Sequence, residues 1–80
     1  MKFFDIIRNE LRRIKNDLES IGTSEVSFVD LLIKYKCSRS MAYDVLSFLK
    51  EFLAKKGLIV RPLPKKIIIV NPAKIKNESV

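Results

Sequence analysis

The sequence predicts a small, mainly α-helical domain with a β-hairpin, in the order helix, strand stub, helix, turn, helix, hairpin. Three segments carry apolar residues at the three- and four-residue spacing of helices that bury one face. Gly22 and Gly57 end two of these segments, and two β-branched runs bounded by prolines follow Gly57. The 80 residues are enough for one domain, predicted over residues 1–72, with residues 73–80 as a flexible C-terminal tail.

The first helix is predicted over residues 3–21. One stripe of this segment is apolar and consists of Phe3, Phe4, Ile7, Leu11, Ile14, Leu18 and Ile21. The opposite face mixes both charge signs. The stripe is therefore expected to pack on the domain core or on a second copy of the chain rather than on a membrane.

The second helix is predicted to begin at Ser27, after a turn and a strand stub over residues 23–26. Ser27 and Asp30 have the three-residue spacing of a capping box. Four apolar or aromatic residues are expected to face inward: Phe28, Leu31, Leu32 and Tyr35. Lys34 and Lys36 are expected to stay outside, next to the following turn.

The third helix is predicted to begin at Ser38 or Ser40, either of which can cap it, and to run to about Lys56. Its apolar stripe consists of Ala42, Val45, Leu46, Leu49, Phe52 and Leu53. The opposite face is polar and carries Arg39, Ser40, Tyr43, Asp44, Ser47 and Lys50.

The β-branched runs 58–61 and 67–70 predict a hairpin with residues 62–66 as its loop. Side chains alternate across a strand, so Ile67 and Ile69 share one face of the second run, and Ile68 and Val70 share the other. One face has the core to cover it. The other needs a cover, for which the first helix, the tail around Ile75 and a partner subunit are all candidates.

Composition excludes several classes of function. The chain has one cysteine and no histidine, so no internal disulfide, metal site or cofactor is predicted. With two glycines there is no phosphate-binding glycine-rich loop, and no paired carboxylates form a recognisable motif, so an enzyme is not expected. No apolar run approaches the roughly 20 residues of a membrane span, and the N-terminal segment lacks an export signal. We expect a cytoplasmic protein, located in the host cytoplasm if the source is a virus.

The net charge of +7 is concentrated in one part of the chain. Residues 1–29 carry five cations and five anions, whereas residues 30–80 carry eleven cations and four anions. The excess therefore coincides with the turn, the third helix and the hairpin. This arrangement favours nucleic acid as a partner over a merely solubilising surface.

Two segments carry a resemblance to a known family. Residues 37–46 (CSRSMAYDVL) look like a turn and the start of a recognition helix around the small residue Ala42, and residues 56–60 (KGLIV) look like the exit into a wing. The chain resembles the winged helix-turn-helix family of transcriptional regulators over about residues 26–71, with residues 3–21 as that family's first helix. Small archaeal and archaeal-virus members are the most similar, and the isoleucine- and lysine-rich composition is compatible with a thermophilic source or an AT-rich genome.

The chain departs from the family pattern at two places. Gly57 comes about one helical turn later than usual, which adds Phe52 and Leu53 to the third helix as surface for a dimer contact. Asp44 stands where many members have a basic or neutral residue; a carboxylate repels phosphate but accepts from a cytosine amino group.

The resemblance implies three sets of DNA contacts. Base edges in the major groove would be met by Arg39, Ser40, Tyr43, Asp44 and Ser47. Phosphates beside the groove would be bound by Lys34, Lys36, Ser38 and Lys50. A basic wing on the backbone or in the minor groove would use Arg61, Lys65 and Lys66.

Each of these residues also has a simpler interpretation. Arg39 is then a solvated residue near a helix start, Tyr43 packs sideways on the second helix, and the wing lysines protect a hairpin edge. Cys37 is interpreted as a small turn residue rather than a redox sensor or an intersubunit disulfide.

The function predicted from these features is that of a sequence-specific double-stranded DNA-binding transcriptional regulator. Repression by a homodimer, paired through the first helix and the extended third helix, is the simplest mechanism, and no small-molecule effector is evident. The alternatives are a winged-helix module for protein contacts, and a plasmid or virus replication or partition factor that binds DNA.

Overall fold

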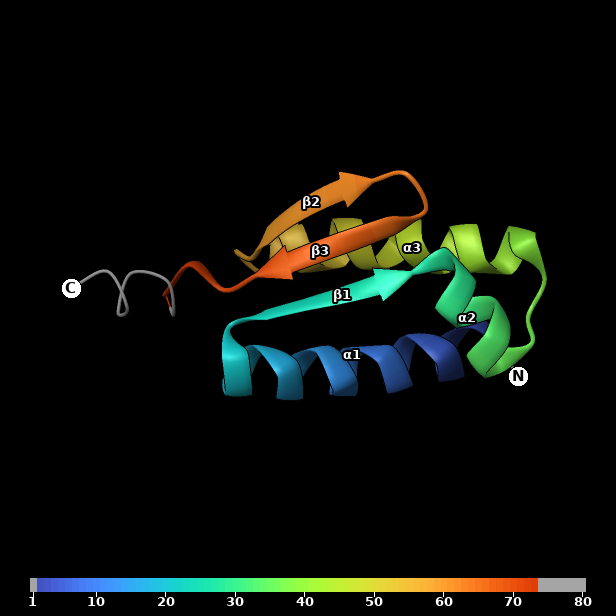
Figure 1. The fold of residues 1–80 in the computed structure, drawn as a ribbon, viewed down its shortest axis with the longest axis horizontal. Helices are drawn as coiled ribbons and strands as arrows, with labels where there is room; N and C mark the ends of the chain where they lie inside the picture. Colours follow the sequence, from blue (N-terminus) through green and yellow to red (C-terminus); the bar gives the residue numbers. More distant parts are fainter. Residues whose placement is uncertain (1, 74–80) are drawn as a thin grey trace.

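The computed structural model describes residues 2–73, which form three helices and three strands (Figure 1). The elements are α1 (Phe3–Ile21), β1 (Thr23–Ser27), α2 (Phe28–Tyr35), α3 (Arg39–Lys55), β2 (Ile59–Leu63) and β3 (Lys66–Val70). This order confirms the predicted fold class and is that of a winged-helix topology. Almost all of the predicted tail, residues 74–80, lies outside the described residues.

The strands form one antiparallel sheet in the order β1-β3-β2. Residues 23–27 are a full strand rather than the predicted stub, because all five residues pair with β3, from Thr23 opposite Val70 to Ser27 opposite Lys66. The predicted five-residue hairpin loop is also wrong. Leu63 pairs directly with Lys66, so only Pro64 and Lys65 form the turn. Pro62 is tolerated inside β2 because β2 is an edge strand.

Helix α1 has the predicted bounds but a shifted buried face. Ile6 and Glu10 are buried, whereas Phe4 and Ile21, expected in the stripe, are 63% and 67% exposed. The face that packs on β1 and α3 therefore passes through Ile6, Ile7, Glu10, Ile14 and Leu18. Apolar type alone did not identify this face, because a carboxylate occupies one of its central positions.

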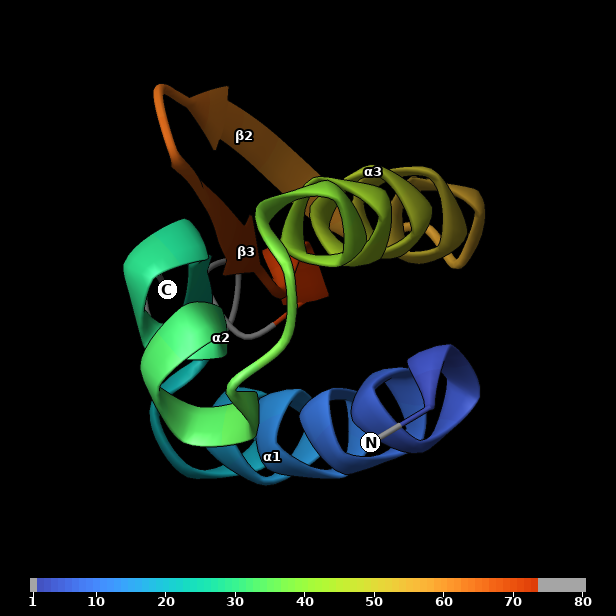
Figure 2. The same cartoon turned by 90° about the vertical axis from the view of Figure 1, so that its right-hand side faces the viewer.

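Helices α1 and α3 cover the same face of the sheet, and α2 lies at one end (Figure 2). β3 alternates as predicted, with Ile67 and Ile69 buried and Ile68 and Val70 only half-buried. The core consists of Ile6, Ile7, Ile14, Leu18, Val26, Phe28, Leu31, Ala42, Val45, Leu46, Leu49, Leu53, Ile67 and Ile69. No helix among residues 2–73 is long and apolar enough to cross a membrane.

The helix ends follow the predicted caps. The Ser27 hydroxyl accepts from the backbone N–H of Asp30 at 3.4 Å and begins α2. Of the two candidate caps for α3, Ser38 is the one used, since its hydroxyl accepts from the Met41 N–H at 3.1 Å. Ser38 therefore marks the residue at which α3 begins.

Candidate nucleic-acid interface

Helices α2 and α3 and the three residues between them form a helix-turn-helix unit. Lys36 ends α2 in the left-handed conformation (φ 52°), and its N–H donates to the Leu32 carbonyl at 2.9 Å. The half-buried Cys37 thiol donates to the Leu31 carbonyl at 3.7 Å. Cys37 therefore packs into the turn, in line with its interpretation as a small turn residue.

The polar face of α3 is exposed along its first three turns. All six side chains predicted on it are exposed: Arg39, Ser40, Tyr43, Asp44, Ser47 and Lys50. On the other side, Ala42, Val45 and Leu49 are fully buried. One face of α3 thus holds the helix on the core, and the other is free to meet a partner.

A groove of about 150 Å³ lies between α3 and the hairpin. Its lining combines residues of the predicted recognition helix with residues of the predicted wing: Tyr43, Leu46, Ser47, Lys50, Pro62, Leu63, Lys65, Lys66 and Ile67. Tyr43, Ser47, Lys50, Lys65 and Lys66 were all predicted as contact residues from sequence. Arg39, Ser40 and Asp44 are exposed on α3 outside the lining of this groove.

Phe28 ties the tip of the hairpin to the helix-turn-helix unit. Its backbone N–H donates to the Lys65 carbonyl at 2.8 Å, and its ring packs on the Tyr43 ring with centroids 4.5 Å apart. Tyr43 therefore packs on the start of α2, as its simpler interpretation holds, while it stays 51% exposed and lines the groove. Sequence reasoning placed Phe28 in the core but missed this linking role, which depends on the tertiary approach of the hairpin turn.

Arg61 lies apart from the wing residue Lys65. In the sheet it is opposite Ile68, on the face turned away from α1 and α3. It is exposed but does not line the groove. The structure therefore separates Arg61 from Lys65. Lys66 belongs to the same face of the sheet as Arg61, where its ammonium lies 3.7 Å from the Glu25 carboxylate, and it also lines the groove at the start of β3.

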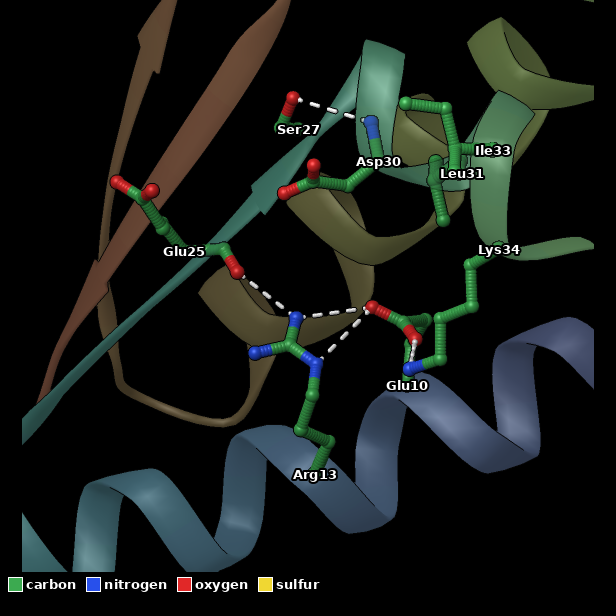
Figure 3. Close-up of a pocket in the computed structure, with 8 residues that line it drawn as sticks. All are labelled: Glu10, Arg13, Glu25, Ser27, Asp30, Leu31, Ile33 and Lys34. Carbon is green, nitrogen blue, oxygen red and sulfur yellow. Dashed lines mark hydrogen bonds and ion pairs between the residues drawn. The ribbon is translucent and has the colours of Figure 1, made fainter.

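Lys34 is engaged in an ion cluster around Glu10 (Figure 3). Glu10 is 3% exposed and accepts from Arg13 at 2.8 and 3.3 Å, from the Lys34 ammonium at 3.0 Å and from the Tyr35 hydroxyl at 2.6 Å. The cluster borders a hollow of about 410 Å³ that Asp30 and Ile33 also line. Because Lys34 pairs with a carboxylate of its own chain, less of its charge is available to a phosphate than sequence alone indicated.

The charge state of the cluster follows from its contacts. Burial by itself raises the pKa of Glu10, but the hydrogen bonds from Tyr35, Arg13 and Lys34 outweigh it and hold the pKa below its ordinary value. Burial and the bond to the Glu10 carboxylate raise the pKa of Tyr35 well above its usual range. Glu10 is therefore ionised and Tyr35 neutral at pH 7.

The same cluster joins three elements of the fold. Arg13 also donates to Asp17 at 3.0 Å and to the Glu25 carbonyl at 2.7 Å, so that it holds β1 against α1. Lys34 and Tyr35 bring α2 to the same carboxylate. Sequence reasoning missed Glu10, although its position between Ile7 and Ile14, at helical spacing, was a usable signal.

Comparison of the chain with protein-family models, with curated proteins and with solved structures found no match. The class defined by the structure is accordingly the fold itself: a small α/β domain with three helices, a three-stranded antiparallel sheet and winged-helix topology.

Proposed function

We propose that the chain is a sequence-specific double-stranded DNA-binding regulator that represses transcription by occupying its operator. The observation that carries the proposal is the groove that unites the exposed face of α3 with the basic turn of the hairpin. An exposed helix beside a basic ribbon fits the major groove and the adjacent backbone of duplex DNA. The concentration of positive charge after residue 29 supports the same partner.

The roles of the residues follow from their places. Tyr43 and Ser47 would meet base edges from the middle of α3, and Arg39 would fork onto a guanine from its N-terminus. Lys65 would bind phosphates or enter the minor groove from the hairpin, and Lys66, whose ammonium lies 3.7 Å from the Glu25 carboxylate, would offer less of its charge. The turn needs little further ordering, because Pro64 restricts it and the bond from Phe28 holds it in place.

A homodimer is part of this proposal, and an aromatic surface supports it. Phe4 is 63% exposed and lies edge-on to Phe48 at 6.3 Å between ring centroids, and Phe48 stacks on Phe52 at 5.8 Å. These rings come from α1 and α3, the helices predicted to pair. Leu53, which the sequence analysis counted as dimer surface, lies instead in the core of its own chain, 4% exposed. A dimer on a pseudo-palindrome would place its two α3 helices about 34 Å apart.

The test is a salt series of binding to random and genomic DNA duplexes. The native chain should show a log–log salt slope equivalent to several phosphates, and the double variant K65A/K66A should lower that slope by about one to two units. Arg39→Ala should reduce preference for a selected sequence while leaving binding to random DNA largely intact. Absence of binding at low salt would refute the proposal.

A matched control removes the same charge elsewhere. Arg12 and Lys15 are exposed on α1, outside the lining of the groove. The double variant R12A/K15A should therefore keep the native salt slope. If it lowers the slope as much as K65A/K66A does, the binding is diffuse attraction to a basic protein and no groove is involved.

A module for protein contacts is the second candidate. Asp44 is exposed on the face offered to DNA, where a carboxylate repels phosphate, and Ile33 on α2 is 69% exposed. Asp44→Asn separates the two accounts. The substitution should strengthen binding to random DNA if α3 enters the groove, and should leave it unchanged if α3 contacts a protein. A replication or partition factor would use the same residues on DNA and differ in the repetition of its sites.

A further inference from the structure

The face of the sheet turned away from the helices carries exposed apolar side chains among polar and charged ones. The strand register places nine side chains on this outer sheet surface: Thr23, Glu25, Ser27, Ile59, Arg61, Leu63, Lys66, Ile68 and Val70. Ile59 and Leu63 are 46% and 44% exposed, and Ile68 and Val70 are half-buried. Ile21, 67% exposed, adjoins this surface in a shallow hollow with Thr23, Glu25 and Ile68.

No helix of residues 2–73 covers this surface, since α1 and α3 pack on the opposite face (Figure 2). The first helix is thereby eliminated as the cover that the sequence analysis sought. Addition of a further strand at the β2 edge is disfavoured, because Pro62 lies within β2 and has no backbone N–H to donate. The face itself, rather than the β2 edge, is the surface suited to docking.

A row of three residues across the strands gives this surface a charge pattern. Arg61 on β2, Ile68 on β3 and Glu25 on β1 are paired in register, so that a cation and an anion flank a central apolar residue. A second copy related by a two-fold axis along the strands would set each Arg61 against the partner's Glu25, with the Ile68 residues in contact at the centre. A two-fold axis across the strands would instead set Arg61 against Arg61. Only the first arrangement is complementary in charge.

We infer that the outer sheet surface binds a second copy of this chain, face to face, through Ile68 and two reciprocal Arg61–Glu25 pairs. The two sheets would stack as in a β-sandwich, with strands nearly aligned. In this arrangement the Lys66 residues of the two copies face each other. Their repulsion is reduced because each Lys66 is paired with Glu25 of its own chain at 3.7 Å. Lys66 also lies at the end of the sheet, where twisted sheets diverge.

Together with the proposed DNA binding, on which this step rests, the contact would bring two DNA duplexes together. α3 and the groove lie along the β2 side of the sheet, whereas α1 packs on β1 at the other side. The two-fold axis along the strands exchanges these sides. The two grooves therefore face in opposite directions, and the pair can hold two separate duplexes together. A dimer formed through Phe4, Phe48 and Phe52 on one operator would thus be joined to a second such dimer on another operator.

The contact should be weak. Nine side chains are fewer than the roughly 20–30 residues that each partner contributes to a stable interface. We therefore expect association that rises with concentration over about 10 μM to 1 mM.

The first experiment is sedimentation equilibrium of the full chain over that range. Ile59→Asp places a charge on the outer sheet surface and should halve the mass of the largest assembly. This result is expected whether or not the chain also dimerises through its aromatic surface. Ile33→Asp is the matched control on α2 and should keep the native mass. A native chain with no concentration-dependent mass, or an Ile59→Asp variant that assembles like it, would overturn the inference.

The charge pairing is tested by reversal. Glu25→Arg alone and Arg61→Glu alone each set like charges opposite one another and should lower the association constant, by about tenfold for like charges in close contact. The double variant E25R/R61E restores opposite pairs between the copies and should associate more strongly than Glu25→Arg alone, which shares its loss of the Lys66–Glu25 pair. Circular dichroism confirms that each variant is folded. A double variant that associates no more strongly than Glu25→Arg would exclude this symmetry.

The bridging consequence is measured by capture of a labelled short random-sequence duplex on a second, immobilised duplex. The native chain and Ile33→Asp should capture it, and Ile59→Asp should bind a single duplex normally but capture none. That last result separates failure of the contact from failure of DNA binding. Removal of residues 74–80 should leave capture unchanged; if it instead increases self-association, the tail is the occupant of this surface and the second copy is not.

Discussion

Replacing Glu10 with Gln should destabilise the domain, because the carboxylate is buried and receives bonds from three side chains. Glu10 is 3% exposed, and its shortest bond, 2.6 Å, comes from Tyr35. A hydrogen bond to a charged group contributes about 1.5–3 kcal/mol. The side chains of Lys34 and Arg13 are 50% and 34% exposed, so their pairs with Glu10 are partly screened and contribute less. We expect a loss of about 2–3 kcal/mol at pH 7.

The assay is urea and thermal unfolding followed by circular dichroism. For a domain of this size, a loss of that order lowers Tm by roughly 10–20 °C. Glu51→Gln, an exposed carboxylate on α3, is the control and should change stability by less than about 0.5 kcal/mol. A Glu10→Gln variant as stable as the native chain at pH 7 would refute the reasoning.

The pH dependence of this difference is a second check. The pKa of Glu10 is lower in the folded chain than in the unfolded one, so its ionised form stabilises the fold above the unfolded pKa. That stabilisation is lost as the pH falls through the folded pKa. The gap between the native chain and Glu10→Gln should therefore be full above about pH 5 and shrink progressively below pH 4. A constant gap down to pH 2 would mean that the charge is not the cause.

Three further predictions concern local structure and use the same unfolding assay. Lys36→Gly should stabilise the domain by about 1 kcal/mol, because Lys36 has a left-handed φ of 52° that glycine adopts freely; a loss would show that the lysine stem packs favourably. Ser38→Ala should cost about 1 kcal/mol by removing the cap of α3, whereas Ser40→Ala should cost little, and equal losses would contradict the assignment of the cap. Leu49→Ala should cost about 2–5 kcal/mol, since Leu49 is fully buried where α3 meets the core; a loss below 1 kcal/mol would mean that the site collapses around the cavity.

Local signals in the sequence were sufficient to predict the order of the helices and strands and the ends of the helices. Ser27 and Asp30 marked the start of α2, and Gly22 and Gly57, both with positive φ (77° and 88°), ended two helices where left-handed conformations were needed. The polar face of α3 was also readable, because helical periodicity separates Arg39 and Ser47 from the core. These features depend on residues a few positions apart, whose geometry the backbone fixes locally.

Features that join distant segments could not be read in the same way. The length of β1 depended on its pairing with β3, about 40 residues later, and the hairpin turn on the register that this sheet imposed. The burial of Glu10 required Lys34 and Tyr35 to arrive from another helix, since a carboxylate is buried only where partners compensate its lost hydration.

The sequence by itself determined the order of the elements, the polar face of α3 and the location of the positive charge. The tertiary structure alone decided that Lys65 and Lys66 share a groove with Tyr43, that Arg61 faces away from it, and that Lys34 is held by Glu10. The physical reason is the same in each case: side-chain periodicity is a property of one segment, whereas the partner of a side chain is set by how the segments pack.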